Sequence, residues 1–111
     1  MIEKTILDHL SERLDVKVYM EEPEKPPKSY VIIEKVGSSQ LNLISTASFA
    51  VQSYGPSMLQ AATLNQSVKD AMTDLVIHSD VISCKLQTDY NFTDPTTKRY
   101  RYQALYDINH Y

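Results

Sequence analysis

The segment DPTTKRYRYQALYDI, residues 94–108, holds the side chains best suited to binding a charged partner. Lys98, Arg99 and Arg101 are interleaved there with two tyrosines. Single-stranded nucleic acids are bound by such combinations, because cations hold phosphates while aromatic rings stack on bases. In a strand, however, neighbouring side chains point to opposite faces. The pattern therefore favours tyrosines that point inward and arginines that point to solvent, with nucleic-acid binding by residues 98–102 as the alternative.

Nucleophilic catalysis would need a nucleophile beside a base, and the candidates are Cys84 and His78. Cys84 falls on the expected inward face of a strand, where a free cysteine behaves as a small apolar residue. His78 follows an expected helix, where contact with the C-terminal carbonyl groups explains it better. A Cys84–His78 pair stays an alternative, but the sequence favours a protein that is not an enzyme.

Metal and phosphate sites also find little support in the sequence. His9, His78 and His110 are scattered, without the spacing of zinc ligands. The acidic residues of the segment EEPEKPPK, residues 21–28, lack the glycine and the ligand spacing of a calcium loop. Two glycines in the whole chain are too few for a glycine-rich phosphate loop. We therefore expect no metal and no cofactor.

The composition is that of an ordinary globular protein, with one domain expected over residues 1–111. The net charge of −3 creates no overall field that would attract nucleic acid or an anionic membrane. Cys84 is the only cysteine, so no intrachain disulfide can form, which fits a reducing compartment. No stretch reaches the length of a transmembrane helix, and the start lacks a signal-peptide pattern. We expect no membrane partner.

Hydrophobic periodicity predicts two helices of unequal length. Apolar residues at helical spacing mark a short N-terminal helix at about 2–14 and one long helix at about 57–77. Ser57 and Gln60 have the spacing of a capping box, in which the serine caps free backbone amides and the glutamine reaches back.

The remaining segments are typical of strands, which predicts an α+β fold. Strands are expected over 16–20, 29–36 and 43–53, with a turn at 37–42 that begins at Gly-Ser-Ser. We expect an antiparallel or mixed sheet of four to five strands packed against the long helix.

The last third of the chain predicts a C-terminal β-hairpin. Its turn is DPTTK, where Pro95 favours a type I turn and Asp94 can accept a backbone hydrogen bond. One face of its first strand should carry Ile82, Cys84, Leu86, Thr88, Tyr90 and Phe92. One face of its second strand should carry Tyr100, Tyr102, Ala104, Tyr106 and Ile108.

The proline-rich segment 21–28 is expected to be an exposed and stiff loop, because three prolines exclude a helix interior or a central strand. Exposed loops are free to meet other proteins, and a stiff loop loses less entropy on binding. The candidate protein-contact residues are Glu21, Glu22, Pro23, Glu24, Pro26 and Pro27. A solvated connector is the alternative interpretation.

The order of these segments resembles a family of viral structural proteins. A short helix precedes a proline-led strand entry, PEKPPKSYVIIEKVG, and a polar-faced strand closes with SYG. The helix PSMLQAATLNQSVKDAM and the hairpin TDYNFTDPTTKRYRYQALYDI complete the pattern. The chain thus resembles the tail-terminator and tail-completion proteins of long-tailed bacteriophages, the lambda-type family with relatives in phages and prophages of Gram-positive bacteria.

This resemblance implies a structural role without catalysis or cofactor. Such proteins form rings, typically hexamers, that cap the tail tube, end its polymerisation and present a surface for the head. The partners implied are further copies of the chain, the tail-tube protein and a head-completion or neck protein. The location implied is the virion tail, and the host cytoplasm during assembly. Lys98, Arg99 and Arg101 would then face the lumen without binding nucleic acid tightly. Another neck or head-completion connector is the alternative.

Overall fold

A computed structural model describes all of residues 1–111 and shows a mixed α+β fold. The helices are α1 (Ile2–Arg13), α2 (Met58–Met72) and the short 3-10 helix η1 (Leu75–Ile77). The strands are β1 (Lys17–Tyr19), β2 (Tyr30–Leu41), β3 (Ile44–Tyr54), β4 (Val81–Asn91) and β5 (Arg101–His110). The expectation of a mixed sheet of four to five strands is confirmed, with five strands.

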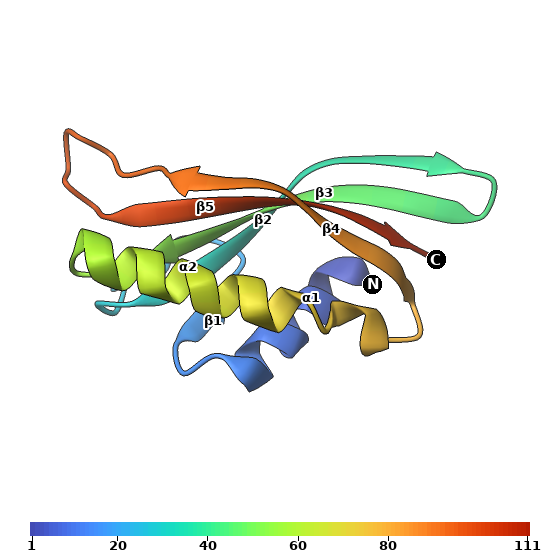
Figure 1. Ribbon diagram of the computed structural model, residues 1–111, viewed down its shortest axis with the longest axis horizontal. Coiled ribbons are helices and arrows are strands. Elements are labelled where there is room, and N and C mark those ends of the chain that lie inside the picture. Colours follow the sequence, from blue (N-terminus) through green and yellow to red (C-terminus); the bar gives the residue numbers. More distant parts are fainter.

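The strands follow the order β1-β2-β3-β5-β4, in which only the β1–β2 pair is parallel. Both α-helices lie against the same face of this sheet (Figure 1). The core forms where they meet it, with Ile6 and Leu10 from α1, Val68 from α2 and Phe49 from β3 all fully buried. Neither helix combines the length and the apolar character that crossing a membrane requires.

The first helical pattern is a good guide to α1, whose buried residues are spaced as an amphipathic helix demands. The long helix is shorter than expected: α2 ends at Met72, and the chain then tightens into η1. Ser57 caps α2, because its Oγ accepts a hydrogen bond from the Gln60 backbone N–H at 3.2 Å. The Ser57 hydroxyl also donates to Gln60 Oε1 at 3.0 Å.

The turn predicted at residues 37–42 is wrong except at its last residue. Residues 37–41 belong to β2 and pair with β3, and a register shift lies between Lys35 and Gly37. The chain reverses at Asn42 and Leu43, where Asn42 takes a positive φ of 58° that asparagine tolerates better than most residues. Pairing with β3 therefore overrides the local turn preference of Gly-Ser-Ser.

The single face predicted for residues 82–92 is also wrong. A second register shift in β4, between Leu86 and Thr88, inserts one extra residue and reverses the alternation beyond it. Cys84 therefore packs towards the core, whereas Tyr90 lies on the helix-free face and accepts a hydrogen bond from a β5 side chain.

The same shift places Asp89 on the face that carries the helices. Its carboxylate accepts a hydrogen bond from Asn65 at 2.8 Å and pairs with Lys69 at 3.0 Å, both on α2. The bond from Lys69 lowers the pKa of Asp89, and the bond from Asn65 adds to this effect. A residue expected on the outer face of a strand thus ties β4 to α2.

Candidate assembly surfaces

The proline-rich loop and the segment 94–99 are brought together by one side chain, Glu22. Its carboxylate accepts a hydrogen bond from the Tyr30 hydroxyl at 2.8 Å and forms an ion pair with Arg99. Arg99 also donates to the Tyr30 hydroxyl. Burial, together with the bond to Glu22, raises the pKa of Tyr30 well above its ordinary value. Two candidate sites that are far apart in the sequence are therefore one cluster.

Aromatic rings form the floor of this cluster on the helix-free face of the sheet. The rings of Tyr30 and Tyr54 stack in parallel with centroids 4.5 Å apart. The Arg99 guanidinium lies 5.0 Å from the Tyr54 centroid, and that of Arg101 lies 4.4 Å from the Phe92 centroid. Arg101 also donates to the Tyr54 hydroxyl at 3.0 Å. These two arginines are stacked against rings from other segments instead of extending into solvent.

The three candidate cations thus have different surroundings. Lys98 lies at a positive φ of 55°, is exposed, and takes part in none of the ion pairs of the molecule. It lines a cavity of about 240 Å³ together with Arg99, Pro26 and Pro27. Asp94 begins the turn as expected, accepting from the Thr96 backbone N–H at 2.9 Å, a bond that lowers its pKa.

The other candidate residues of the loop make no bond that fixes them. Glu21 and Glu24 are exposed and form no ion pair. Pro26 and Pro27 are also exposed, while Pro23 is half-buried. No group of three or more histidine, cysteine, aspartate or glutamate side chains is close enough to hold a metal ion. The loop can therefore offer an exposed surface to a partner, anchored at one point by Glu22.

The helix-free face of the sheet continues as a ladder of polar side chains. Gln52 donates to Gln103 at 2.9 Å, and Gln103 donates to Tyr90 at 2.6 Å, which links β3, β5 and β4. Farther along, Ser48 donates to Asp107 at 2.7 Å. A parallel chain runs from Thr46 through Asn109 to Ser83. These polar side chains form hydrogen bonds with one another, so this face of the sheet can be exposed to water without a covering layer.

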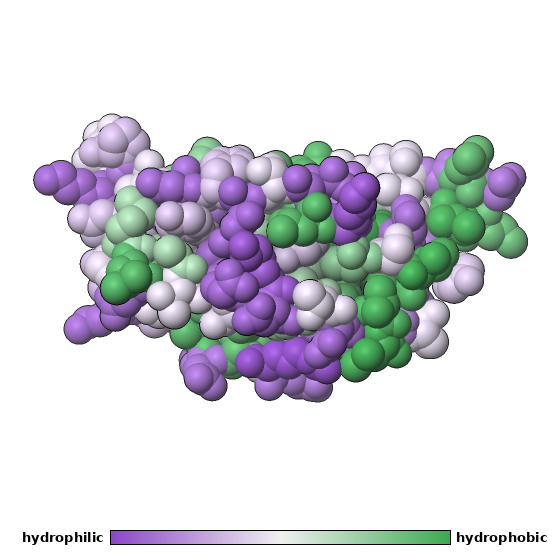
Figure 2. Space-filling model, in the orientation of Figure 1, coloured by the Kyte–Doolittle hydropathy of each residue, from purple (hydrophilic) through white to green (hydrophobic).

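A hairpin arm, residues 36–44, extends where β2 and β3 pass beyond the helices (Figure 1). Every residue of β2 from Glu34 to Leu41 is exposed. At the tip, the side chains of Leu41 and Leu43 are 77% and 83% exposed. Figure 2 shows hydrophobic side chains gathered at this end of the molecule. The tip therefore has no cover within its own chain and is a candidate interaction surface.

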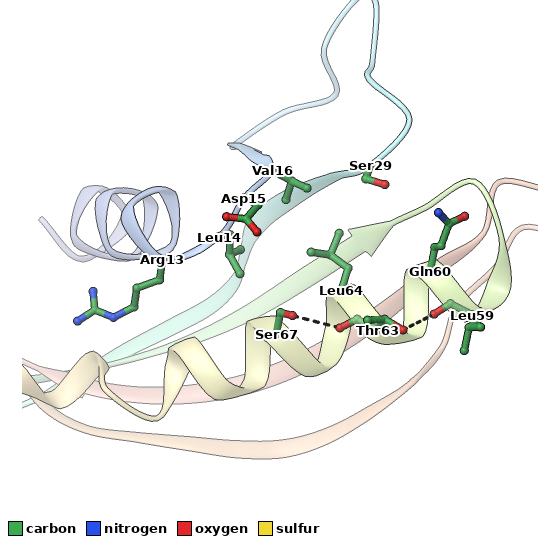
Figure 3. Close-up of a pocket in the computed structure, with 10 residues that line it drawn as sticks. All are labelled: Arg13, Leu14, Asp15, Val16, Ser29, Leu59, Gln60, Thr63, Leu64 and Ser67. Atoms are coloured by element: carbon green, nitrogen blue, oxygen red, sulfur yellow. Dashed lines mark hydrogen bonds between the residues drawn. The ribbon is translucent and has the colours of Figure 1, made fainter.

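A groove opens between the first turns of α2 and the segment that follows α1, with a volume of about 400 Å³. Figure 3 shows Leu14, Val16 and Leu64 in the space between these segments, with Leu59 at the start of α2. Leu59 is 78% exposed. The hydroxyl groups of Thr63 and Ser67 bond to helix carbonyls, so they are already satisfied. Arg13 and Asp15 also line the groove, so it offers an apolar strip flanked by two charged side chains.

His78, the alternative partner considered for Cys84, lies beside another histidine. His78 Nε2 lies 2.9 Å from His9 Nδ1, and His9 is fully buried between α1 and the end of α2. Cys84 is half-buried on β4, and burial raises the pKa of its thiol to about 11. A pattern in the sequence could have revealed His9, because it shares the helical spacing of Ile6 and Leu10.

Comparison of the chain with protein-family models gave no match, and comparison with curated proteins gave none either. The function proposed below therefore depends on the geometry of these surfaces and on the sequence pattern described above.

Proposed function

We propose that the protein is a structural subunit that joins head to tail with copies of itself into a ring, hexameric in the assembled particle. The ring would cap the tail tube of a long-tailed bacteriophage, end its polymerisation and present the surface for the head. The observation that carries the proposal is the hairpin arm, which has no cover within its own chain. A subunit that covers its neighbour's arm, while its own arm is covered by the next, makes a heterologous contact, and such contacts form a ring when the rotation between subunits closes.

The helix-free face supports the same proposal. A ring that conducts a genome needs a wall that tolerates water and does not bind nucleic acid tightly. The ladder from Gln52 through Gln103 to Tyr90 offers satisfied polar groups, and Arg101 on that face is held against Tyr54 and Phe92. In the proposed ring this face lines the lumen, while α1 and α2 lie outside it.

The test combines the purified protein with tail tubes of the same phage. Light scattering and negative-stain electron microscopy should find rings at tube ends, and particles made without the protein should carry tails of uncontrolled length. A compact two-fold dimer under every condition, including in the particle, would contradict the ring. Tails of normal length without the protein would contradict tail termination, and its presence on heads that lack tails would place it in the neck instead.

The proline-rich loop is the surface proposed for contact with the tube or the next subunit. Replacing Glu21 and Glu24 with alanine leaves the Glu22–Arg99 pair in place, so the loop keeps its anchor. We expect this double variant to keep its stability but to give overlong tails or tails that fail to join heads. Normal tails and normal infectivity would show that the loop only connects β1 and β2.

A further inference from the structure

Charged residues are missing from one long part of the chain. From Val36 to Val68 there is no aspartate, glutamate, lysine, arginine or histidine. This stretch contains the hairpin arm and the first turns of α2, and both carry exposed residues. Exposed helices usually carry charges, whereas the buried centres of protein interfaces are depleted of lysine, glutamate and aspartate. The hairpin arm and the first turns of α2 share this depletion, and the two charged side chains of the groove, Arg13 and Asp15, come from the segment around the end of α1.

The arm and the groove cannot meet within one molecule. The tip of the β2–β3 hairpin and the start of α2 lie at opposite ends of the long axis, which measures 44 Å (Figure 1). Each chain therefore carries one apolar protrusion, at Leu41 and Leu43, and one groove with an apolar strip, beside Leu59 and Leu64. A protrusion and a hollow on different parts of the same chain define a contact between successive copies.

We propose that the tip of the hairpin arm of one copy docks in the groove between α2 and the segment that follows α1 of the next copy. Leu41 and Leu43 would enter beside Leu14 and Leu64, and Leu59 would close over them. This inference rests on the proposed ring and names its subunit contact. The occupant of the groove is a second copy of this chain, not a small molecule, because the Thr63 and Ser67 hydroxyls on its α2 side already bond to helix carbonyls.

A cysteine cross-link between two different chains tests the contact. One chain carries Leu43→Cys and the other carries Leu59→Cys, and the two are mixed and oxidised at high concentration and on tail tubes. The control mixes Leu43→Cys with Ile77→Cys, since Ile77 is 64% exposed but lies in η1, away from the groove. The native Cys84 is a poor competitor because it is half-buried and ionises only at high pH.

We expect the 43–59 disulfide to form at least tenfold faster than the 43–77 disulfide. Equal rates, or no 43–59 product in rings that have formed on tubes, would overturn the docking while leaving the ring intact. If tails reach normal length in particles made without this protein, the proposed function fails. A disulfide that forms selectively between residues 43 and 59 would still establish the contact between copies. The two proposals can therefore fail separately.

Charge substitutions give a second measurement that does not depend on thiol chemistry. Leu43→Lys and Leu59→Asp should each abolish association, and the mixture of the two variants should associate again, because the opposite charges meet. Ile77→Lys is the matched control and should associate like the unchanged protein. Leu43 and Leu59 are both exposed in the single chain, so Leu43→Lys and Leu59→Asp should each keep the unfolding midpoint of the unchanged protein. Association of both single variants at unchanged affinity would overturn the docking.

Discussion

At the scale of single residues, His9 shows how a buried contact fixes a protonation state. Its Nε2 lies 2.7 Å from the carbonyl oxygen of Ala71, which can only accept, so Nε2 carries the proton. The bare Nδ1 then accepts from Arg13 at 3.0 Å, and His78 Nε2 lies 2.9 Å from the same nitrogen. A second proton on His9 would set an N–H against the Arg13 guanidinium, which can only donate. His9 is therefore held neutral where α1 meets the end of α2.

Burial is the largest cause that lowers the pKa of His9, and Arg13 and His78 add to it, against the opposing effects of the Ala71 carbonyl and Asp74. Because the folded-state pKa lies below that of the unfolded chain, the full contribution to stability is present above about pH 6.5. It is lost as the pH falls through the folded-state pKa. We expect the free energy of unfolding, measured with urea, to fall between pH 7.5 and pH 5.

His9→Gln and His110→Gln separate this effect from the other titrating groups. His9→Gln should be less stable at pH 7.5, but its free energy of unfolding should depend much less on pH. The reason is that glutamine does not titrate, so no group with a lowered pKa remains between α1 and the end of α2. His110→Gln should keep the pH dependence of the unchanged protein, because His110 is only partly buried at the end of β5. An equally steep pH dependence in His9→Gln would show that another group is responsible.

Glu22 is the acidic residue of the proline-rich loop with a structural role. Glu22→Ala removes the acceptor of both the Tyr30 hydroxyl and Arg99, whereas Glu24→Ala removes an exposed charge without a partner. Because the pair is partly exposed, we expect Glu22→Ala to cost about 1 kcal/mol in urea unfolding. Glu24→Ala should stay within about 0.5 kcal/mol of the unchanged protein. Equal effects of the two substitutions on the free energy of unfolding would show that Glu22 does not anchor the loop.

At the scale of elements, periodicity predicted most of the architecture because most elements bury one face. The core positions of α1 and the alternation of Ala47, Phe49 and Val51 in β3 follow from that requirement. The failures at Gly37 and beyond Leu86 both lie next to a register shift. A register shift is fixed by the partner strand, and a single sequence carries no record of which residues face each other.

The sequence predicted less of the candidate surfaces than of the helices and strands, because these surfaces also depend on which segments become neighbours. The sequence identified Glu22 and Arg99 as candidates in separate segments, but only the sheet order places them side by side. Alternation suggested that the arginines extend into solvent, yet rings from β3 and from the end of β4 lie within reach of them. Contacts between distant segments depend on tertiary packing, which local spacing does not encode.

The junction between β3 and α2 depends on a close approach at Gly55. A Cβ atom there would lie 2.7 Å from the backbone nitrogen of Ala61, too close for any real contact. Gly55→Ala should therefore move the start of α2 and cost roughly 1–3 kcal/mol of unfolding free energy. Gly37→Ala is the matched control, because its Cβ would meet nothing within 4 Å, and it should change stability by less than about 0.5 kcal/mol. A neutral Gly55→Ala would show that the junction can relax.

At the scale of the whole molecule, charge argues against a nucleic-acid-binding module. The net charge of −3 repels phosphates at long range. Of the three cations in the segment 98–101, Arg99 is paired with Glu22, and Arg101 is held by Phe92 and Tyr54. Only Lys98 is free to meet a phosphate without breaking an existing contact. Aromatic rings are present beside the cations, but two of them, Tyr30 and Tyr54, are buried by each other and by their neighbours.

We therefore expect no measurable binding of single-stranded DNA near physiological salt, as followed by fluorescence anisotropy. Any binding at low salt should weaken with a slope of log affinity against log salt no steeper than about −0.7, the value for one phosphate contact on a single strand. Lys98→Ala should abolish that residual binding, while Glu22→Ala should strengthen it by releasing Arg99. Micromolar binding at physiological salt with a slope near −2 would mean that Arg99 and Arg101 leave their ring and carboxylate contacts for phosphates. The helix-free face would then be a binding platform, and its proposed place along an inert lumen would have to be given up.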